Sequence, residues 1–435
     1  MWALALDGRL ASAVRLRRES FGAIAYVPER DDFFALDRRY AAIAHHAEHG
    51  KVTLRGVAAV RARRLASLGI LETDPRTPQR PHHGMATVGG LAGIPDVGEP
   101  LLVNCLSTAY CPLRCLYCYA DDVMTPHQDT EDWPALQRVA AMAEATPSMV
   151  AVITGGEPLY DTKRAAYLIR RLGPGKALVL DTSGAGDLTA LLPLLREYSV
   201  HVRVSVDSAD STLNDSLRPI RRRYLPLGAS AHGLAYGALA LLRQHGIPHS
   251  VQTVVSARNA DLTELLRLRD DLVARGTRHW ILHVAVPAGK AAHRPWIQPH
   301  PEVVRPVLAT LVARTMRGRV PIDIRVTGAH REPDAVLLID PGGRLCLEDR
   351  DVGGKKAIAD SPGPQLDRVL AQFRIHVNNR AHARRYLNGS FDPAPDAARG
   401  PAPWLRRLVA GVPGRPGSAA LLPPTALLSH HADPE

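Results

Sequence analysis

Apolar runs alternate with helical stretches through the central part of this 435-residue chain. Six short, mainly apolar runs are typical of strands that are buried on both faces. Between them, apolar residues recur at the spacing of one helix face. Strands that alternate with helices predict a parallel sheet, and therefore an α/β fold. The predicted strands cover residues 101–105, 149–154, 177–181, 202–206, 250–255 and 280–284, and the predicted helices cover 136–145, 164–172, 188–198, 233–245 and 262–275.

Residues 1–75 show a different pattern, in which strands come first and helices follow. Asp37 is a predicted helix N-cap, and Gly50 is the predicted stop of that helix. A hairpin followed by helices in so short a span predicts a small winged-helix domain. The predicted elements are strands over 14–27 (one long strand or a bent pair) and 33–36, a turn over 28–32, and helices over 37–49 and 57–68.

Four further segments complete the predicted organisation. Residues 76–98 are rich in Pro, Gly and His and lack periodicity, which predicts a linker before the α/β core at 99–325. A short C-terminal extension, 326–388, holds a hairpin-like stretch and a helical pattern near its middle. Residues 389–435 turn to Pro, Ala and Gly, which predicts a disordered tail.

Composition and charge exclude some classes of protein. Hydrophobic residues make up 46% of the chain and charged residues 22%, which predicts a globular core. The net charge of +11 fits nucleic acid, an acidic peptide or a phosphorylated ligand, and equally a basic surface with no single partner. No apolar run approaches the ~18 residues of a membrane span, and the first residues do not predict a signal peptide. We therefore expect a cytoplasmic protein with reduced thiols.

Three of the five cysteines lie within eight residues, in the segment CPLRCLYC directly after the first predicted strand. Three thiolates on one short loop can face a common centre, and soft thiolate ligands favour zinc, Cu(I) or iron–sulfur clusters. A structural zinc site needs a fourth ligand, which His127 could supply. A 4Fe–4S cluster held by three cysteines would instead keep one iron open.

This loop resembles the signature of the radical S-adenosylmethionine (SAM) superfamily, with Tyr117 at the aromatic position. The resemblance implies a 4Fe–4S cluster on Cys111, Cys115 and Cys118, whose open iron chelates SAM. In the family, an electron from the cluster cleaves SAM to a 5′-deoxyadenosyl radical, which abstracts a substrate hydrogen. It also implies an electron donor such as flavodoxin or ferredoxin. The implied fold is a partial (β/α)6 TIM-like barrel with the active site at the C-terminal ends of the strands.

Later strand ends resemble the SAM-binding motifs of the same family. The second strand ends in TGGEP, which resembles the motif that contacts the SAM amino group; the alternative is a tight turn capped by Glu157. Arg218 resembles the arginine that pairs with the SAM carboxylate; the alternative is the start of a basic surface run. Residues 252–255, Asn259, His283 and 287–289 also fall at family positions, as weaker signals. The implied SAM-binding residues are Tyr117, Gly155, Gly156, Glu157, Thr182, Ser183, Ser205 and Arg218.

Two cysteines lie outside this loop. Cys346 is alone in the C-terminal extension, and because one thiol cannot hold an auxiliary cluster, we expect a single cluster. Cys346 is a candidate hydrogen-atom donor, as in some peptide epimerases of the superfamily; the alternative is a small buried apolar side chain on a strand. Cys105, on the first predicted strand, is expected in the core.

Residues 14–73 resemble the PqqD-like recognition element of enzymes that modify ribosomally made peptides. The matching features are the segments FFALD and LASLGILE. The resemblance implies that a leader peptide adds a strand to an exposed sheet edge. A DNA-binding winged helix is the rival, but no basic stripe interleaved with aromatic residues favours nucleic acid.

Together these features predict a radical SAM enzyme that modifies a precursor peptide, with the N-terminal domain bound to the leader. One alternative is a radical SAM enzyme that acts on a small molecule or nucleotide. Another is a zinc-stabilised winged-helix regulator with a non-catalytic barrel. The sequence leaves the reaction open among cross-linking, thioether formation, epimerisation and decarboxylation, because substrate-facing side chains vary on a shared barrel.

Overall fold

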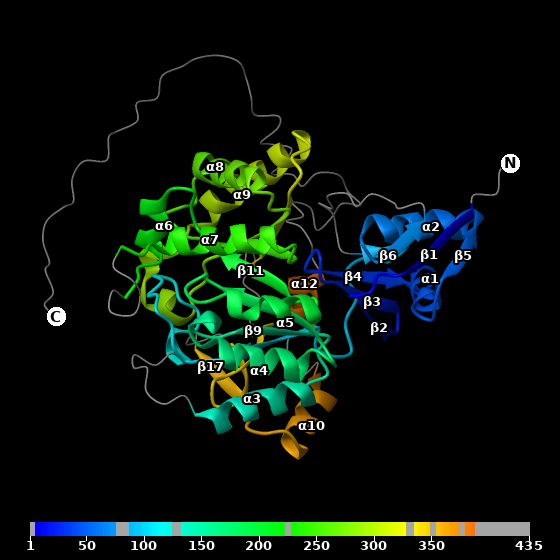
Figure 1. The fold of residues 1–435 in the computed structure, drawn as a ribbon, viewed down its shortest axis with the longest axis horizontal. Helices are drawn as coiled ribbons and strands as arrows, with labels where there is room; N and C mark the ends of the chain where they lie inside the picture. The colour runs from blue at the N-terminus through cyan, green and yellow to red at the C-terminus, as the bar shows by residue number, and fades with distance from the viewer. Residues whose placement is uncertain are drawn as a thin grey trace, which may run out of the picture. The chain divides into compact units, whose positions relative to one another are not determined.

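The computed structural model describes residues 5–74, 87–123, 132–221, 228–327, 335–348, 354–373 and 379–387 (Figure 1). The predicted tail, 389–435, lies outside these residues. Within the described residues, no helix combines the length and the apolar character that a membrane crossing requires.

The N-terminal region contains two small, mainly antiparallel sheets and two helices. Asp37 caps the first helix by accepting hydrogen bonds from the backbone N–H groups of Arg39 and Tyr40, which confirms the predicted helix start. The N-terminal strand, β1, does not belong to the predicted pattern, and it pairs with two later strands. The winged-helix assignment stays a prediction. The elements are β1 (Ala5–Leu10), β2 (Arg15–Glu19), β3 (Gly22–Val27), β4 (Asp32–Asp37), α1 (Arg38–Glu48), β5 (Val52–Arg55), α2 (Gly56–Ser67) and β6 (Leu71–Asp74), in sheets of order β5-β1-β6 and β2-β3-β4-β7.

The predicted linker contains one short strand. β7 (Thr87–Val88) pairs parallel with β4, and Gly90 N–H donates to Asp37. A strand of two residues is too short to show a periodicity, so the sequence pattern could not reveal it. Residues 75–86 lie outside the described residues.

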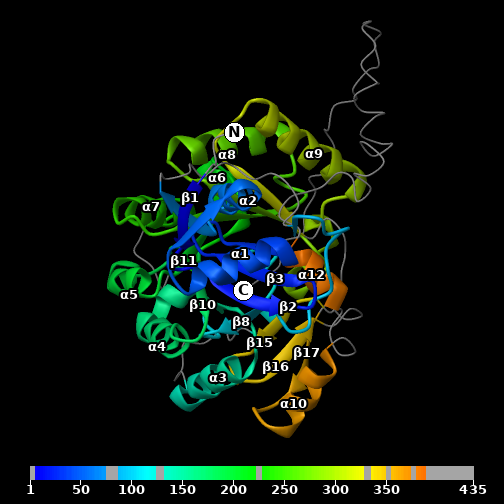
Figure 2. The same ribbon diagram turned by 90° about the vertical axis from the view of Figure 1, so that its right-hand side faces the viewer.

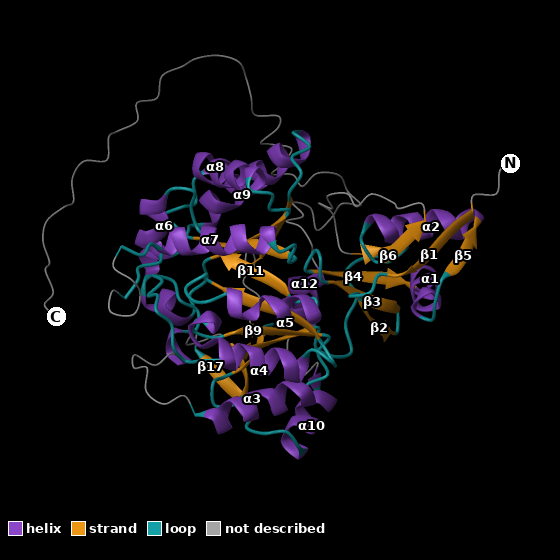
Figure 3. Cartoon of the chain, in the orientation of Figure 1, coloured by secondary structure: helices purple, strands orange, loops and turns teal. Residues whose placement is uncertain are grey.

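The central region is a large sheet with helices along its outer face (Figures 1 and 3). All six predicted strands are present, and they pair parallel in chain order. This arrangement confirms an α/β fold with a parallel sheet, consistent with a partial barrel. The strands are β8 (Leu102–Leu106), β9 (Val150–Thr154), β10 (Ala177–Thr182), β11 (His201–Ser205), β12 (His249–Val255) and β13 (His279–Val284). The main helices are α3 (Trp133–Ala145), α4 (Thr162–Leu172), α5 (Leu192–Glu197), α6 (Ser211–Leu217), α7 (Ala231–Gln244), α8 (Leu262–Ala274) and α9 (Pro301–Arg317).

The sheet continues beyond the six predicted strands at both edges. β14 (Asp323–Thr327) pairs parallel with β13, and β15 (Leu337–Ile339) pairs parallel with β8. β14 alternates polar and apolar residues, as the predicted β11 does, and the sequence analysis did not assign a strand to it. The C-terminal extension adds β16 (Leu345–Glu348), β17 (Lys355–Ala359), α10 (Pro364–Ala371) and α12 (Asn379–Leu387), visible in Figure 2.

Candidate active site

The cysteine loop follows β8 and is fixed by backbone contacts. Its Arg114 and Leu116 N–H groups donate to the carbonyl oxygens of Pro219 and Leu217, at 2.7 and 3.0 Å. The Lys290 N–H donates to the Cys118 carbonyl at 2.8 Å. Gly289 has a φ of 53°, and a Cβ there would lie 2.4 Å from the same carbonyl oxygen, so only glycine fits. The loop is therefore held from both sides by segments far away in the sequence.

The three cysteines of this loop are free thiols, in positions that disfavour a bare thiolate. Burial raises the pKa of Cys111 and Cys115, and it raises the pKa of Cys118 to about 12. Neighbouring thiols raise the pKa of Cys111 further, so the three lie within electrostatic reach of one another. A bound cation would supply the missing charge, because metal binding deprotonates thiols.

The spacing of these thiols bears on which metal they fit. No three His, Cys, Asp or Glu side chains among the described residues lie close enough together to hold one metal ion. A 4Fe–4S cluster binds each thiolate at a different iron, so it fits thiols that lie near one another without converging on one point. His127, the candidate fourth zinc ligand, lies outside the described residues.

The glycine pair after β9 allows close packing against the cysteine loop. Gly155 has a φ of 137°, and a Cβ on Gly156 would lie only 1.6 Å from the Tyr110 carbonyl oxygen. The Gly156 N–H donates to Thr108 O, and the Glu157 N–H to Tyr110 O, both at 2.8 Å. These glycines thus bring the turn that carries Glu157 directly onto the loop that carries the cysteines.

Glu157 is a buried carboxylate surrounded by neutral donors. It accepts hydrogen bonds from Thr182 Oγ1 at 2.5 Å, from Ser183 N at 2.7 Å and from Ser183 Oγ, and its own helical turn adds Leu159 N at 3.0 Å. Burial nevertheless raises its pKa, and no cation balances its charge among the described residues. The predicted motifs on β9 and β10 therefore meet, around an acceptor suited to a ligand ammonium group.

Tyr117 and Arg218, predicted on separate motifs, meet at Asp207. The Arg218 guanidinium donates to Tyr117 Oη at 3.0 Å and lies 3.6 Å from the Asp207 carboxylate, which also accepts from Tyr117. Arg218 is buried, so it does not start an exposed basic surface run. Ser205 lies on the neighbouring strand end, where its hydroxyl accepts from Gln252 Nε2 at 3.1 Å.

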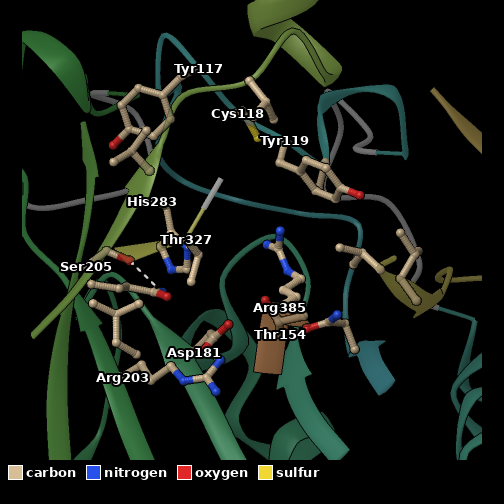
Figure 4. Close-up of a pocket in the computed structure, with 18 of the residues that line it drawn as sticks. Tyr117, Cys118, Tyr119, Thr154, Asp181, Arg203, Ser205, His283, Thr327 and Arg385 are labelled. Atoms are coloured by element: carbon tan, nitrogen blue, oxygen red, sulfur yellow. Dashed lines mark hydrogen bonds and ion pairs between the residues drawn. The ribbon is translucent and has the colours of Figure 1, made fainter. Parts of the chain in front are cut away.

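A single cavity joins the cysteine loop to the barrel interior (Figure 4). Some predicted residues line it, and others lie behind its wall. Cys111, Gly156, Glu157, Thr182 and Ser183 are not among the residues lining this cavity. The predicted residues that line it are Cys115, Tyr117, Cys118, Gly155, Ser205 and Arg218.

The floor of the cavity is an ion-pair network contributed in part by the N-terminal region. Asp31, at the tip of the β3–β4 hairpin, accepts from Arg203 at 2.6 and 2.9 Å and from Arg325 at 3.1 Å. Burial alone would raise the pKa of Asp31, but the two arginines outweigh burial and hold the pKa well below its usual value. Asp181 has only a contact of 3.5 Å with Arg203, and burial raises its pKa to about 6.

The sequence reasoning missed this floor. The available signal was Arg203, a charge inside an otherwise apolar strand, since a buried charge requires a partner. Its partner, Asp31, is 172 residues away, so no local pattern links the two. Arg385 of α12 also points into the cavity, and no sequence signal distinguishes it from the neighbouring basic residues (Figure 4).

The two remaining cysteines are buried on strands. Cys105 lies in the core, as predicted, and burial raises its pKa to about 12. Cys346 packs against Leu106 and Leu338 and is not among the residues that line the described cavity. The hydrogen-donor role of Cys346 stays a prediction.

Comparisons with known proteins agree with the cysteine loop and the parallel sheet. A family model described as Radical SAM superfamily matches residues 106–270. PqqA peptide cyclase of Methylobacterium sp. (strain 4-46) is 27% identical over 241 residues, which are 53% of this chain and 60% of that protein. Pre-heme d1 synthase of Dinoroseobacter shibae is 27% identical over 247 residues, 54% of this chain and 56% of that protein. The chain thus spans less than two thirds of the length of these curated relatives.

The solved structure of Streptococcus suis SuiB bound to S-adenosylmethionine has the same fold. It aligns with a TM-score of 0.52 at 13% identity, over 80% of this chain and 85% of SuiB. SuiB bound to its precursor peptide SuiA aligns with a TM-score of 0.50 at 12% identity, over 78% of this chain and 82% of SuiB. The family match, the three-cysteine loop and the parallel sheet agree: residues 106–270 of this chain match the radical SAM superfamily.

Proposed function

We propose that this chain is a radical SAM enzyme that modifies a ribosomally made peptide. Its cofactors are one 4Fe–4S cluster and SAM, as its family implies. When bound, they supply an electron transfer that cleaves SAM and yields a 5′-deoxyadenosyl radical able to abstract a substrate hydrogen. The observation that carries the proposal is the three-thiol loop packed directly against the turn that holds Glu157.

The residues at the strand ends divide the tasks of binding these cofactors. Cys111, Cys115 and Cys118 hold the cluster. Glu157 accepts the SAM ammonium, which gives this buried carboxylate the cation that it lacks. Arg218 offers its guanidinium to the SAM carboxylate.

The remaining predicted residues set the shape of that site. Gly155 and Gly156 keep the β9 turn close to the cysteine loop, while Thr182 and Ser183 orient the Glu157 carboxylate by hydrogen bonds. Ser205 adds a hydroxyl at the cavity wall, and Tyr117 covers the cluster loop. Precise positioning of this kind is the protein's contribution to cofactor chemistry.

Similarity to PqqA peptide cyclase, and the fold shared with the peptide-bound SuiB structure, support a peptide substrate. The sheet β5-β1-β6 ends at two short strands to which a leader peptide could add. Helix α2, beside this sheet, exposes Val57 and Val60, which could contact apolar leader side chains. The similarity to Pre-heme d1 synthase favours the second candidate, a small-molecule substrate.

Anaerobic reconstitution tests the chemistry. The full-length protein with iron, sulfide and a reductant should absorb near ~400 nm and convert SAM to 5′-deoxyadenosine. Binding of zinc without iron, or intact SAM after reduction, would contradict the proposal. The same protein, incubated with a candidate precursor peptide, should change the mass of that peptide. Val60→Glu should weaken peptide binding without affecting SAM cleavage, whereas an unmodified and unbound peptide would favour the small-molecule candidate.

A further inference from the structure

The cavity has an excess of positive charge that the described residues do not fully balance. Five cationic and two acidic side chains line it, before any cofactor is counted. Four of the five cations have partners in the protein. Arg203 and Arg325 bind Asp31, Arg218 binds Tyr117 at 3.0 Å, and Lys355 binds Asp122 at 2.7 Å.

Arg385 is the fifth cation, and within the described part of the chain it makes no hydrogen bond or ion pair. Its side chain is half-buried and points into the cavity from α12 (Figure 4). The carboxylates nearest the barrel floor are already bound by the other arginines. A half-buried guanidinium without an acceptor has lost part of its hydration without a replacement, so it favours an anion that enters the cavity.

The helix that carries Arg385 is fixed, so the side chain is presented from a rigid base. His382, buried on the same helix, accepts from Leu101 N–H at 2.9 Å and contacts the Ala335 carbonyl at 2.8 Å. Burial lowers the pKa of His382 to about 4, which keeps this link neutral. Asn379 forms two further hydrogen bonds with the backbone of Val97.

His283, at the end of β13, also lines the cavity, and its pKa reflects the same charge. Burial lowers its pKa first, and the positive charges of Arg385, Arg203 and Arg325 lower it further. Arg385 therefore acts electrostatically across the cavity, toward a residue that lies at the end of a barrel strand.

We propose that Arg385 binds a carboxylate of the substrate, and so selects a peptide with an acidic side chain or a free C-terminus beside the position that is modified. This inference rests on the proposed function. The planar guanidinium suits bidentate binding of a carboxylate, which gives orientation as well as affinity. Because the radical reacts with the hydrogen placed closest to it, one such anchor would decide which residue of the peptide is modified.

Three small peptides test this inference without turnover. Acetyl-Ala-Glu-Ala-amide carries a side-chain carboxylate, acetyl-Ala-Ala-Ala carries only the terminal one, and acetyl-Ala-Gln-Ala-amide carries neither. Their binding to the full-length protein is titrated by saturation-transfer NMR, for wild type, Arg385→Gln and the neighbouring exposed Arg384→Gln. At least one carboxylate peptide should bind about tenfold tighter than the Gln peptide. This preference should persist in Arg384→Gln and disappear in Arg385→Gln.

The identity of the favoured peptide distinguishes the two sources of the carboxylate. An equal affinity for all three peptides in the wild type, or a preference that survives in Arg385→Gln, overturns the inference. A tenfold loss of SAM affinity in Arg385→Gln with unchanged peptide binding also overturns it, since Arg385 would then hold the cofactor's carboxylate.

The pKa of His283 and the cleavage of SAM are measured as two further readouts. Arg385→Gln should raise the pKa of His283, measured by NMR, because it removes one of the charges that lower it, and Arg384→Gln should not. Failure of the proposed function is separate: it appears as intact SAM after reduction, whatever the peptides do.

Discussion

Two buried carboxylates, Glu157 and Asp31, show how differently the two ends of the barrel are built. Glu157 follows the C-terminal end of β9, and only neutral hydroxyl and N–H groups surround it among the described residues. Asp31 reaches the interior from the N-terminal region and is bound by two arginines. Burial raises the pKa of Glu157, while the arginines lower that of Asp31 against the effect of burial.

The difference between them is the presence of a counter-charge in the protein itself. A buried carboxylate that is paired with cations has its charge balanced within the protein, so it has a structural role. A buried carboxylate with donors and no cation has its geometry fixed and its charge unbalanced, so it is suited to a cationic ligand. The floor of the cavity therefore serves as a frame, and the strand ends as a binding site.

The largest expected effect concerns the cluster loop. Cys115→Ala should reduce the iron content from about four per chain to near zero and abolish SAM cleavage, because the cluster loses one of three ligands. Iron analysis and 5′-deoxyadenosine chromatography measure both. Cys105→Ala is the control, because this buried residue lies on β8 and should keep its iron. Equal iron in the two variants would contradict the assignment.

The next effect concerns the floor. Asp31→Asn should lower the free energy of unfolding by up to about 3–5 kcal/mol, because it removes the carboxylate that two buried guanidinium groups share and leaves Arg203 only Asp181 at 3.5 Å and Arg325 only Asp32 at 3.0 Å. Urea unfolding measures the change. Glu72→Gln breaks an exposed ion pair with Arg9 and should cost less than about 1 kcal/mol. A similar small cost for Asp31→Asn would show that the floor is not a structural frame.

Glu157→Gln, in contrast to Asp31→Asn, should affect ligand binding more than stability. It removes a buried charge without a cation, but the amide NH2 replaces an oxygen that accepts from a backbone N–H, so the two effects oppose each other and the stability of the unliganded protein should change little. Its affinity for SAM should fall about 10–100-fold, as expected for the loss of a charged hydrogen bond. Calorimetry on the reconstituted enzyme measures this, with exposed Asp187→Asn as the control. Unchanged SAM affinity would remove Glu157 from the binding site.

The smallest effect is the pH dependence that Asp181 introduces. Its pKa of about 6 in the folded protein exceeds the ordinary value of 3.8, so the folded state binds this proton more tightly than the unfolded chain does. Stability from this group is therefore present below pH 3.8 and is lost as the pH rises to 6. The side chain is 18% exposed, so solvent reduces the effect. As the pH rises from 4 to 8, the free energy of unfolding of Asp181→Asn should increase by about 1–2 kcal/mol relative to that of the wild type. A gain that does not depend on pH would contradict this cause.

Most strands of the central sheet could be predicted because they are mainly apolar and largely buried. β14 was missed although its alternation of polar and apolar residues matches that of β11, which was predicted. Burial of Cys105 and the N-cap at Asp37 followed from local rules and are confirmed. The cysteine spacing pointed to one loop, but the contacts of Arg114 and Leu116 that fix this loop come from residues about a hundred positions away.

The sequence by itself determined the alternation of strands and helices, the three-cysteine loop and the resemblance to the radical SAM superfamily, because each depends on residues close together in the chain. Only the tertiary structure decided which charges meet. Asp31 and Arg203 are 172 residues apart, and Arg385 enters the cavity from the last described helix. Electrostatic interactions act through distance in space, so a counter-charge present at Asp31 and missing at Glu157 becomes visible only after folding.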